Sequence, residues 1–380
     1  MTTSSSTKTL RVLGFMTGTS LDAVDMAVIE TDGENIISFG PAGEMKLDAE
    51  TRAIVEDAIE DALDWERDEE EPDSFEDARM AVADAHLAAA LGFMAVNGVK
   101  ASSLDLVGVH GQTVLHEAPT PGSPGRTVQL IDALSVAEGL GVRTAYDFRS
   151  ADVAAGGQGA PLAPVYHAAL VKKAGLSGPV AVLNLGGVGN ITLVRADGGL
   201  EAFDTGPANG MVDLLVQSRG KKRMDEGGKL AAAGTVDQVV LDAYLAHPYF
   251  AAAGPKSLDR FDFSLDPVSG LSLEDAAATL TAFAAEAAAL GVARCAEKPT
   301  KVVACGGGRH NPVLLAAIRE RAGVPVTTAE DEGWRGDSIE AEAFAFLAAR
   351  CLLGLPISYP GTTGVPEPMT GGRIVEPGEQ

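Results

Sequence analysis

The sequence contains few cysteines and few positive charges for its length. Only 3 of its 380 residues are cysteine, and Cys295, Cys305 and Cys351 lie too far apart for a zinc or redox motif. Neither a disulfide framework nor a thiolate zinc site is therefore indicated. We expect each thiol to behave as a small buried apolar group.

Positive charge is scarce because 29 Lys and Arg residues face 53 Asp and Glu residues, giving a net charge of -24. This balance argues against a nucleic-acid partner, because binding a phosphate backbone requires clustered Lys and Arg. The acidic excess fits a surface kept soluble at high salt, and it fits an ordinary acidic surface equally well. We expect the acidic run at 64–73 to be a solvated loop without chemistry.

No uninterrupted apolar run is long enough to cross a membrane, and the first residues are polar rather than signal-like. We therefore expect a cytoplasmic protein without a membrane partner. The length exceeds the usual limit of one hydrophobic core, which predicts two domains. The boundary is expected at the Gly- and Pro-rich segment 154–164, giving domains 1–150 and 151–380, with the C-terminal helix as a candidate to pack back on the first domain.

The first strands carry neither a P-loop nor a dinucleotide-binding fingerprint. They form instead a predicted hairpin, Leu10–Met16 and Val24–Glu30, joined by the polar turn 17–22. This turn can offer backbone N–H groups to a phosphate, while Asp22 can hold a hydrated metal ion. Gly, Ser and Thr also suit any tight turn, so the hairpin alone leaves both interpretations open.

The same pattern occurs again later in the chain. Two apolar strands flank the glycine turn Gly186–Asn190, which predicts a second, related domain facing the same ligand. A third glycine segment, Gly306–Gly308, stands between a predicted strand and a predicted helix. That order brings the backbone close to a phosphate or a nucleoside.

Polar residues follow two other predicted strands. His110, Gln112 and Thr113 come at the end of one, where open α/β sheets place their ligand groups, although His110 is equally well explained as a packed core histidine. Asp204 comes at the end of the other, before a glycine and a proline that should stop the strand. We expect its carboxylate to face the ligand site.

Together these residues resemble the sugar kinase, heat-shock ATPase and actin superfamily, and within it the anhydro-N-acetylmuramic acid kinase family. Seven ordered blocks carry the resemblance: 14–25, 110–113, 147–149 with 156–162, 184–190, 203–209, 306–311 and 340–344. The resemblance implies an α/β fold with two ribonuclease H-like domains of the actin-like ATPase (sugar kinase) superfamily around a central cleft.

The resemblance also implies an activity and the residues that perform it. The family uses ATP and Mg²⁺ to hydrolyse the 1,6-anhydro bond of 1,6-anhydro-N-acetylmuramic acid and to phosphorylate O6, giving N-acetylmuramic acid 6-phosphate. Asp204 would be the general base, and Asp22 would hold the metal. The residues implied to bind ATP and its phosphates are Gly18, Thr19, Ser20, Leu21, Asp22, Ala23, Val24, Asp25, Gly186, Gly187, Asn190, Gly306, Gly307 and Gly308. Those implied to bind the sugar are His110, Gln112, Thr113, Arg149, Asn209 and Glu340.

The sequence departs from the family pattern at a few positions. Thr17 and Ala23 replace the usual Ser and Gly of the phosphate turn, Ala208 replaces a glycine after Asp204, and the Lys256–Arg260 loop loses the usual pattern. The reaction class is thus better defined than the sugar. The alternatives are a kinase of a different (anhydro)sugar on the same fold and a nucleotide-gated binding protein. We expect a small-molecule sugar as partner, with a homodimer as one option for the assembly.

Overall fold

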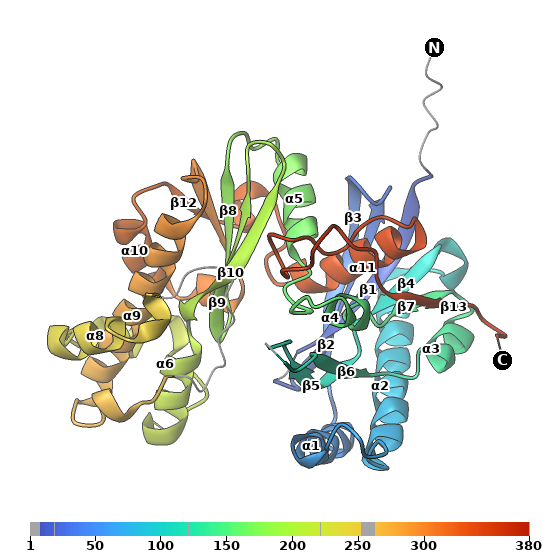
Figure 1. Cartoon of the computed structure of the whole chain (residues 1–380), viewed down its shortest axis with the longest axis horizontal. Helices are drawn as coiled ribbons and strands as arrows, with labels where there is room; N and C mark the ends of the chain where they lie inside the picture. Colours follow the sequence, from blue (N-terminus) through green and yellow to red (C-terminus); the bar gives the residue numbers. More distant parts are fainter. Residues whose placement is uncertain (1–7, 19, 121, 221, 252–262, 380) are drawn as a thin grey trace. The chain divides into compact units, whose positions relative to one another are not determined.

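The computed structural model describes residues 8–18, 20–120, 122–220, 222–251 and 263–379. The chain forms two compact units (Figure 1). The first unit takes the chain up to Lys173 together with everything from Ser338 onward, and the second is Ala174–Asp337.

This division differs from the boundary expected at residues 150 and 151. Helix α5 (Pro164–Lys173) belongs to the first unit because its buried Tyr166 packs against Phe346 and donates a hydrogen bond of 2.5 Å to Glu342. Both partners lie on α11 (Ile339–Leu352), which itself packs on strand β1 of the first unit.

The first unit is built on a six-stranded sheet in the order β13-β7-β4-β1-β2-β3. Strand β2 runs antiparallel to both of its neighbours, β1 and β3; β4 and β7 run parallel to β1, and β13 pairs antiparallel with β7 at the edge. The strands are β1 (Leu10–Thr17), β2 (Ala23–Thr31), β3 (Ile36–Lys46), β4 (Leu106–Val109), β7 (Thr144–Tyr146) and β13 (Arg373–Val375). A separate hairpin joins β5 (Gln112–Glu117) to β6 (Arg126–Leu130).

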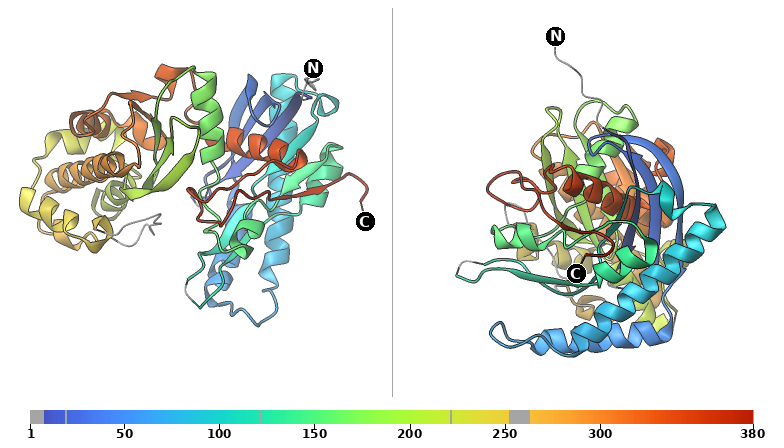
Figure 2. Two further views of the ribbon diagram at one scale, coloured as in Figure 1. Left: turned by 45° about the horizontal axis from the view of Figure 1, so that its top comes forward. Right: turned by 90° about the vertical axis from the view of Figure 1, so that its right-hand side faces the viewer.

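Helices cover both faces of this sheet. Leu13 and Phe15 of β1 point to one face and pack in a core with α2 (Ser74–Asn97), which runs beside α1 (Ala49–Asp64) (Figure 2). Side chains alternate along a strand, so Gly14 faces the opposite side, where α11 approaches closely. The remaining helices of the unit are α3 (Ala133–Leu140) and α4 (Ser150–Ala154).

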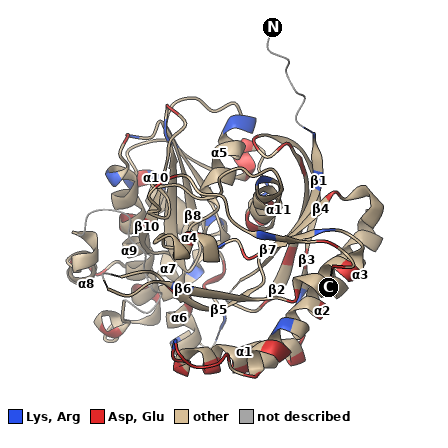
Figure 3. Cartoon of the chain, turned by 45° about the vertical axis from the view of Figure 1, so that its right-hand side comes forward, with Lys and Arg blue, Asp and Glu red and all other residues tan. Residues whose placement is uncertain are grey.

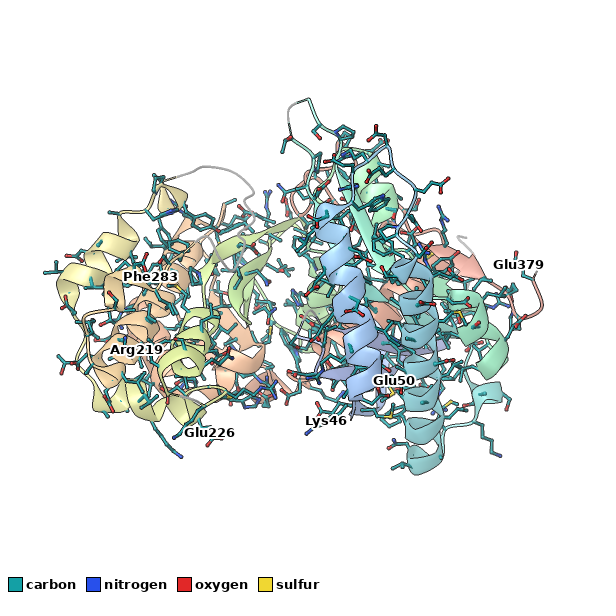
Figure 4. All side chains as sticks on the ribbon, turned by 90° about the horizontal axis from the view of Figure 1, so that it is seen from below. Lys46, Glu50, Arg219, Glu226, Phe283 and Glu379 are labelled. Atoms are coloured by element: carbon teal, nitrogen blue, oxygen red, sulfur yellow. The ribbon has the colours of Figure 1, made fainter. Side chains whose placement is uncertain are left out.

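The second unit has a five-stranded sheet in the order β10-β9-β8-β11-β12. Its strands are β8 (Val180–Leu185), β9 (Val188–Val194), β10 (Leu200–Pro207), β11 (Lys301–Cys305) and β12 (Val326–Thr328). Its helices include α6 (Gly210–Leu215), α7 (Lys229–Ala233), α8 (Gln238–Leu245), α9 (Leu273–Arg294) and α10 (Pro312–Arg321). Phe283 of α9 is fully buried, whereas Arg219 and Glu226 lie at the periphery (Figure 4).

The two sheets share one topology. In each, a first strand pairs antiparallel with the second, the second pairs antiparallel with the third, and two later strands continue the sheet parallel to the first on its other side. This is the strand order of the ribonuclease H-like fold, used twice. The expected fold class is therefore confirmed.

Two helices, each interrupted by charged residues, are nonetheless long and apolar enough to meet a length and composition test for a membrane span. They are α2 and α9, whose most apolar windows are 39% and 78% buried. The core helix of a globular unit passes the same test, and α9 supplies core residues on most of its turns. The acidic residues of α1 and of the run that follows it are exposed. They appear as red segments of the ribbon along α1 in Figure 3.

Candidate active site

The phosphate hairpin of the first unit is the turn between β1 and β2. Strand pairing continues to Thr17 opposite Val24, and the Leu21 N–H donates to the Gly18 carbonyl at 3.2 Å. Leu21 has a φ of 52°, a left-handed conformation that costs a residue with a side chain about 1 kcal/mol or more. Within the described residues, Asp147, two positions before Arg149, is the other non-glycine residue with positive φ. Such conformations gather at functional sites, so both support the predicted blocks.

The side chains of this turn divide into two groups. Leu21 and Val24 are buried in the core of the unit, so only their backbone can face a phosphate. The other described residues of the predicted set keep accessible surface: Gly18, Ser20, Asp22, Ala23 and Asp25. Thr19 lies outside the described residues.

A buried histidine that the sequence analysis did not identify, His86, is hydrogen-bonded to Thr17 at the end of β1. His86 of α2 is 1% exposed, and its Nδ1 lies 2.7 Å from the Val82 carbonyl, which can only accept. Its Nε2 is therefore the acceptor for the Thr17 hydroxyl at 3.2 Å. Burial lowers the pKa of His86 to about 4, which keeps the ring neutral and preserves this acceptor at neutral pH.

A second group of site residues lies around Arg149. The Arg149 Nε donates to His110 Nε2 at 3.0 Å, and Nη1 donates to the Gly159 carbonyl at 2.7 Å. Arg cannot accept, so His110 Nδ1 carries the ring proton and donates to the Gly111 carbonyl at 2.8 Å. Burial and the charge of Arg149 hold the pKa of His110 well below its usual value. Both ring nitrogens of His110 thus have partners, with Nε2 holding Arg149 and Nδ1 fixed by the Gly111 carbonyl, and the ring packs on Phe344.

Gln112 and Thr113 begin the β5–β6 hairpin. Thr113 is half-buried, and its hydroxyl accepts a hydrogen bond of 3.4 Å from Gln129. Gln112 is 1% exposed, and its Oε1 has no hydrogen-bond partner among the described residues. The structure therefore places Thr113, more than Gln112, where a ligand could reach it.

Glu340 stands in the first turn of α11, where part of its side chain is exposed while protein atoms surround its carboxyl. Desolvation by the surrounding protein raises the pKa of its carboxyl, and the positive charge of Arg149 acts in the opposite direction. Burial in turn lowers the pKa of Arg149 to about 10, with Glu340 and Asp152 opposing that shift. The predicted sugar residues Arg149 and Glu340 are thus electrostatic neighbours in the first unit.

In the second unit, three predicted segments meet at the carboxyl end of β8. The Gly186 carbonyl accepts from the Asn209 N–H at 3.1 Å, and the Gly187 carbonyl accepts from the Gly210 N–H at 3.1 Å. A side chain at Gly308 would lie 3.0 Å from Asn209 Nδ2 and from the Leu185 carbonyl. Gly306 has a φ of 74°, and a Cβ at this position would lie 2.9 Å from the Leu185 backbone. Glycine is required here because two backbone segments touch.

Asp204 lies within a strand and does not end one, contrary to expectation. Strand β10 continues to Pro207, and its register to β9 shifts between Asp204 and Gly206, which is a β-bulge. A bulge re-aims a side chain, and bulges are common beside active sites. Asp204 is half-buried, pairs across the sheet with Asn190, and accepts a hydrogen bond of 2.7 Å at its main-chain carbonyl from the Tyr249 hydroxyl.

The anhydro-N-acetylmuramic acid kinase family matches residues 10–377 of this chain. The kinase of that name from Phenylobacterium zucineum (strain HLK1) is 62% identical over 368 residues, which cover 97% of this chain and 100% of the relative. This chain belongs to the anhydro-N-acetylmuramic acid kinase family. The kinase of that name from Caulobacter vibrioides is 62% identical over 366 residues, covering 96% and 99% of the two chains.

Membership of the anhydro-N-acetylmuramic acid kinase family confirms the resemblance seen in the seven sequence blocks. Among solved structures, the (R)-2-hydroxyglutaryl-CoA dehydratase component A of Acidaminococcus fermentans matches with a TM-score of 0.46 and 13% identity, over 90% of this chain and 98% of that chain. A similarity of that size transfers neither ligand nor activity.

The magnesium ion implied by the sequence resemblance needs oxygen donors beside the phosphate turn. Within the described part of the chain, no three His, Cys, Asp or Glu side chains gather as a metal site. Mg²⁺ is commonly held by one or two carboxylates with water and substrate phosphates completing the shell. A single accessible carboxylate at Asp22, beside a turn suited to phosphate, fits that donor set.

Proposed function

We propose that this chain is an ATP-dependent kinase that opens the 1,6-anhydro bond of 1,6-anhydro-N-acetylmuramic acid and phosphorylates O6. The observation that carries the proposal is the 62% identity to kinases of that name over 97% of the chain. Two ribonuclease H-like units, each with a glycine-bearing hairpin after its first strand, fit this function. The product would be N-acetylmuramic acid 6-phosphate.

Asp204 is proposed as the general base. Its carboxylate would take a proton from the water that attacks the anomeric carbon, so that the bond from that carbon to O6 breaks. The released O6 would then attack the γ-phosphorus of ATP, and ADP would leave. The bulge at Asp204 supports this assignment because it turns the side chain away from regular strand geometry.

Backbone groups and Arg149 are proposed to bind the two substrates. The turn 18–25 and the glycines at 186–187 and 306–308 would place backbone N–H groups against ATP, as lysine-free phosphate loops require. Arg149, Thr113, Glu340 and Asn209 would contact the sugar. His110 would act through Arg149, because both of its ring nitrogens already have partners.

We further propose Mg²⁺ as cofactor, with Asp22 as its protein ligand. When bound, the ion would neutralise phosphate charge during transfer. Because the reaction consumes ATP, the cytoplasm is the proposed location, and the net charge of -24 supports a small-molecule partner over nucleic acid. No membrane partner is proposed, and a homodimer is proposed as the assembly.

A coupled ADP-release assay tests the proposal. The protein is given ATP and Mg²⁺ with and without 1,6-anhydro-N-acetylmuramic acid, and the Asp204→Asn variant is measured beside it. We expect sugar-dependent ADP release, reduced at least about a hundredfold in the variant because a positioned base contributes about that much. Binding of ATP, measured by calorimetry, should change little.

Asp197→Asn is the matched control. Asp197 is exposed in the turn between β9 and β10 of the same sheet, and its replacement removes the same charge. It should retain wild-type turnover. Equal loss of ATP binding and turnover in Asp204→Asn would remove Asp204 from the role of base. Folded wild-type protein that releases ADP only with another sugar would support a kinase of a different (anhydro)sugar. Slow ADP release that no sugar changes would support a nucleotide-gated binding protein.

A further inference from the structure

The C-terminal tail of the first unit, which follows α11, is tied to the loop at 156–162. Thr363 of this tail is fully buried, and its hydroxyl donates to Asp152 Oδ2 at 2.6 Å. Its carbonyl accepts from the Gln158 N–H at 2.7 Å. The tail then continues to β13, which pairs with β7. A residue far along the chain is thus hydrogen-bonded to the segment that holds Arg149.

Asp152 is a buried carboxylate that the proposed reaction does not use. It lies on α4 and is 2% exposed, and its Oδ1 accepts from the Gly159 N–H at 2.6 Å. A buried carboxylate is costly unless donors satisfy it, so both of its hydrogen bonds matter. A side chain at Gly157 would collide with Asp152 and would lie 2.5 Å from Val365, which explains the glycine between the two segments.

Gly159 connects this carboxylate to Arg149. While its N–H is held by Asp152, its carbonyl accepts from Arg149 Nη1 at 2.7 Å. The guanidinium is held at a second point by neutral His110. In the described part of the chain these are the hydrogen bonds that Arg149 makes, so its other N–H groups are available to a ligand.

We propose that Thr363 and Asp152 are positioning residues that set the Arg149 guanidinium for the sugar. The inference rests on the proposed function, in which the sugar is the ligand of Arg149. Hydrogen bonds then run from the Thr363 hydroxyl to Asp152, from Asp152 to the Gly159 amide, and from the Gly159 carbonyl to Arg149.

Thr363 is proposed to keep the negative charge of Asp152 apart from the positive charge of Arg149. Arg149 and Asp152 attract each other electrostatically. The Thr363 hydroxyl and the Gly159 amide occupy the carboxylate oxygens of Asp152 and keep the two charged groups from pairing directly. Without the hydroxyl, the carboxylate is free to turn toward Arg149 and draw the guanidinium away from the sugar.

The test compares Thr363→Val with Thr362→Val. Thr362 is also buried in the tail, but its hydroxyl donates to the Tyr359 carbonyl at 3.1 Å and accepts from the Tyr359 N–H at 3.2 Å, so valine removes buried hydroxyl hydrogen bonds without touching Asp152. In Thr363→Val we expect the KM for the anhydro sugar to rise roughly tenfold, as loss of a hydrogen bond to a charged group predicts, with the KM for ATP unchanged. Thr362→Val should leave both constants unchanged. Thr363→Ser, which keeps the hydroxyl, should restore the wild-type value.

Hydrogen exchange provides a readout that does not depend on turnover. Peptides covering 156–162 should exchange faster in Thr363→Val than in wild type or Thr362→Val, because the Gly159 amide loses its anchored acceptor. If the wild-type protein turns over no sugar, the proposed function is wrong. The exchange result still tests whether the Thr363 hydroxyl anchors Asp152 and the Gly159 amide. If Thr363→Val does not fold, Thr363→Ala, which also removes the hydroxyl and leaves Asp152 charged, takes its place with the same expectations and Thr362→Ala as control. Unchanged exchange, or equal changes in sugar KM for both valine variants, would overturn the proposal.

Discussion

Replacing Gly14 by alanine tests how α11 is seated on the sheet of the first unit. Gly14 lies in β1, and a Cβ at this position would collide with the Ala341 carbonyl and lie 2.5 Å from the Ala345 nitrogen and 2.8 Å from the Ala345 Cβ. Gly108 in β4 faces the same helix, where a Cβ would lie 2.5 Å from the Phe344 carbonyl. The helix therefore rests directly on strand backbone at two glycines.

The size of the effect follows from these contacts. The colliding atoms belong to the backbone, so no side-chain rotation relieves the overlap, and α11 with its buried Phe344 and Phe346 must move away from β1. Overpacking of this kind costs about 1–3 kcal/mol, and backbone contact places Gly14→Ala at the upper end. Alanine also lowers the conformational entropy of the unfolded chain, which offsets about 0.4–1 kcal/mol of this loss. The net loss is about 2 kcal/mol, which lowers the melting temperature by about 4–8 °C.

Urea and thermal unfolding of Gly14→Ala measure this loss, with Gly92→Ala as the matched control. Gly92 is exposed in α2, and a Cβ there meets nothing within 4 Å. Alanine in a helix should stabilise it by about 0.5–1 kcal/mol, so the same substitution has opposite signs at the two sites. An unfolding midpoint for Gly14→Ala at or above that of wild type would refute the close packing of α11.

Two further predictions concern stability. His86 has a pKa of about 4 in the folded protein and about 6.5 unfolded, so the free energy of unfolding should fall as the pH drops from about 6.5 toward 4, where the unfolded chain binds the proton that the fold excludes. This loss should reach about 3 kcal/mol, and His86→Gln should remove it in urea titrations at several pH values; identical pH dependence in the two proteins would contradict the neutral buried ring. Asn311 caps α10 by accepting from the Val313 and Leu314 N–H groups. Asn311→Ala should cost about 1–2 kcal/mol, measured by chemical denaturation, and a loss below about 0.3 kcal/mol would show that the cap is dispensable.

Local patterns were sufficient to predict the first hairpin of each unit and the glycine-bearing turn within it. Two alternating apolar strands around a polar turn define β1 and β2, and the same reasoning finds β8 and β9. The cap of α9 is a local feature of the same kind, because Ser272 accepts from the Asp275 N–H three residues later. These features depend on residues close together in the sequence.

Features that depend on distant contacts could not be predicted in this way. The C-terminal helix was a candidate to pack on the first domain, but the two glycines in distant strands that receive α11 could not be identified from local patterns. The contact of Tyr166 with Glu342 that joins α5 to that unit could not be identified either. The bulge at Asp204 requires knowledge of the register to β9. His86 stands four residues after Val82 on the apolar face of an alanine-rich helix, a position that could have suggested burial but not its bond to Thr17.

The product formed from 1,6-anhydro-N-acetylmuramic acid, ATP and Mg²⁺ tests the proposed reaction most directly. Mass spectrometry with phosphorus NMR should find a product equal to the substrate plus one water and one phosphoryl group, with the phosphate on O6. A product that gains the phosphoryl group but keeps the anhydro ring, or no sugar product from folded protein, would contradict the proposed reaction.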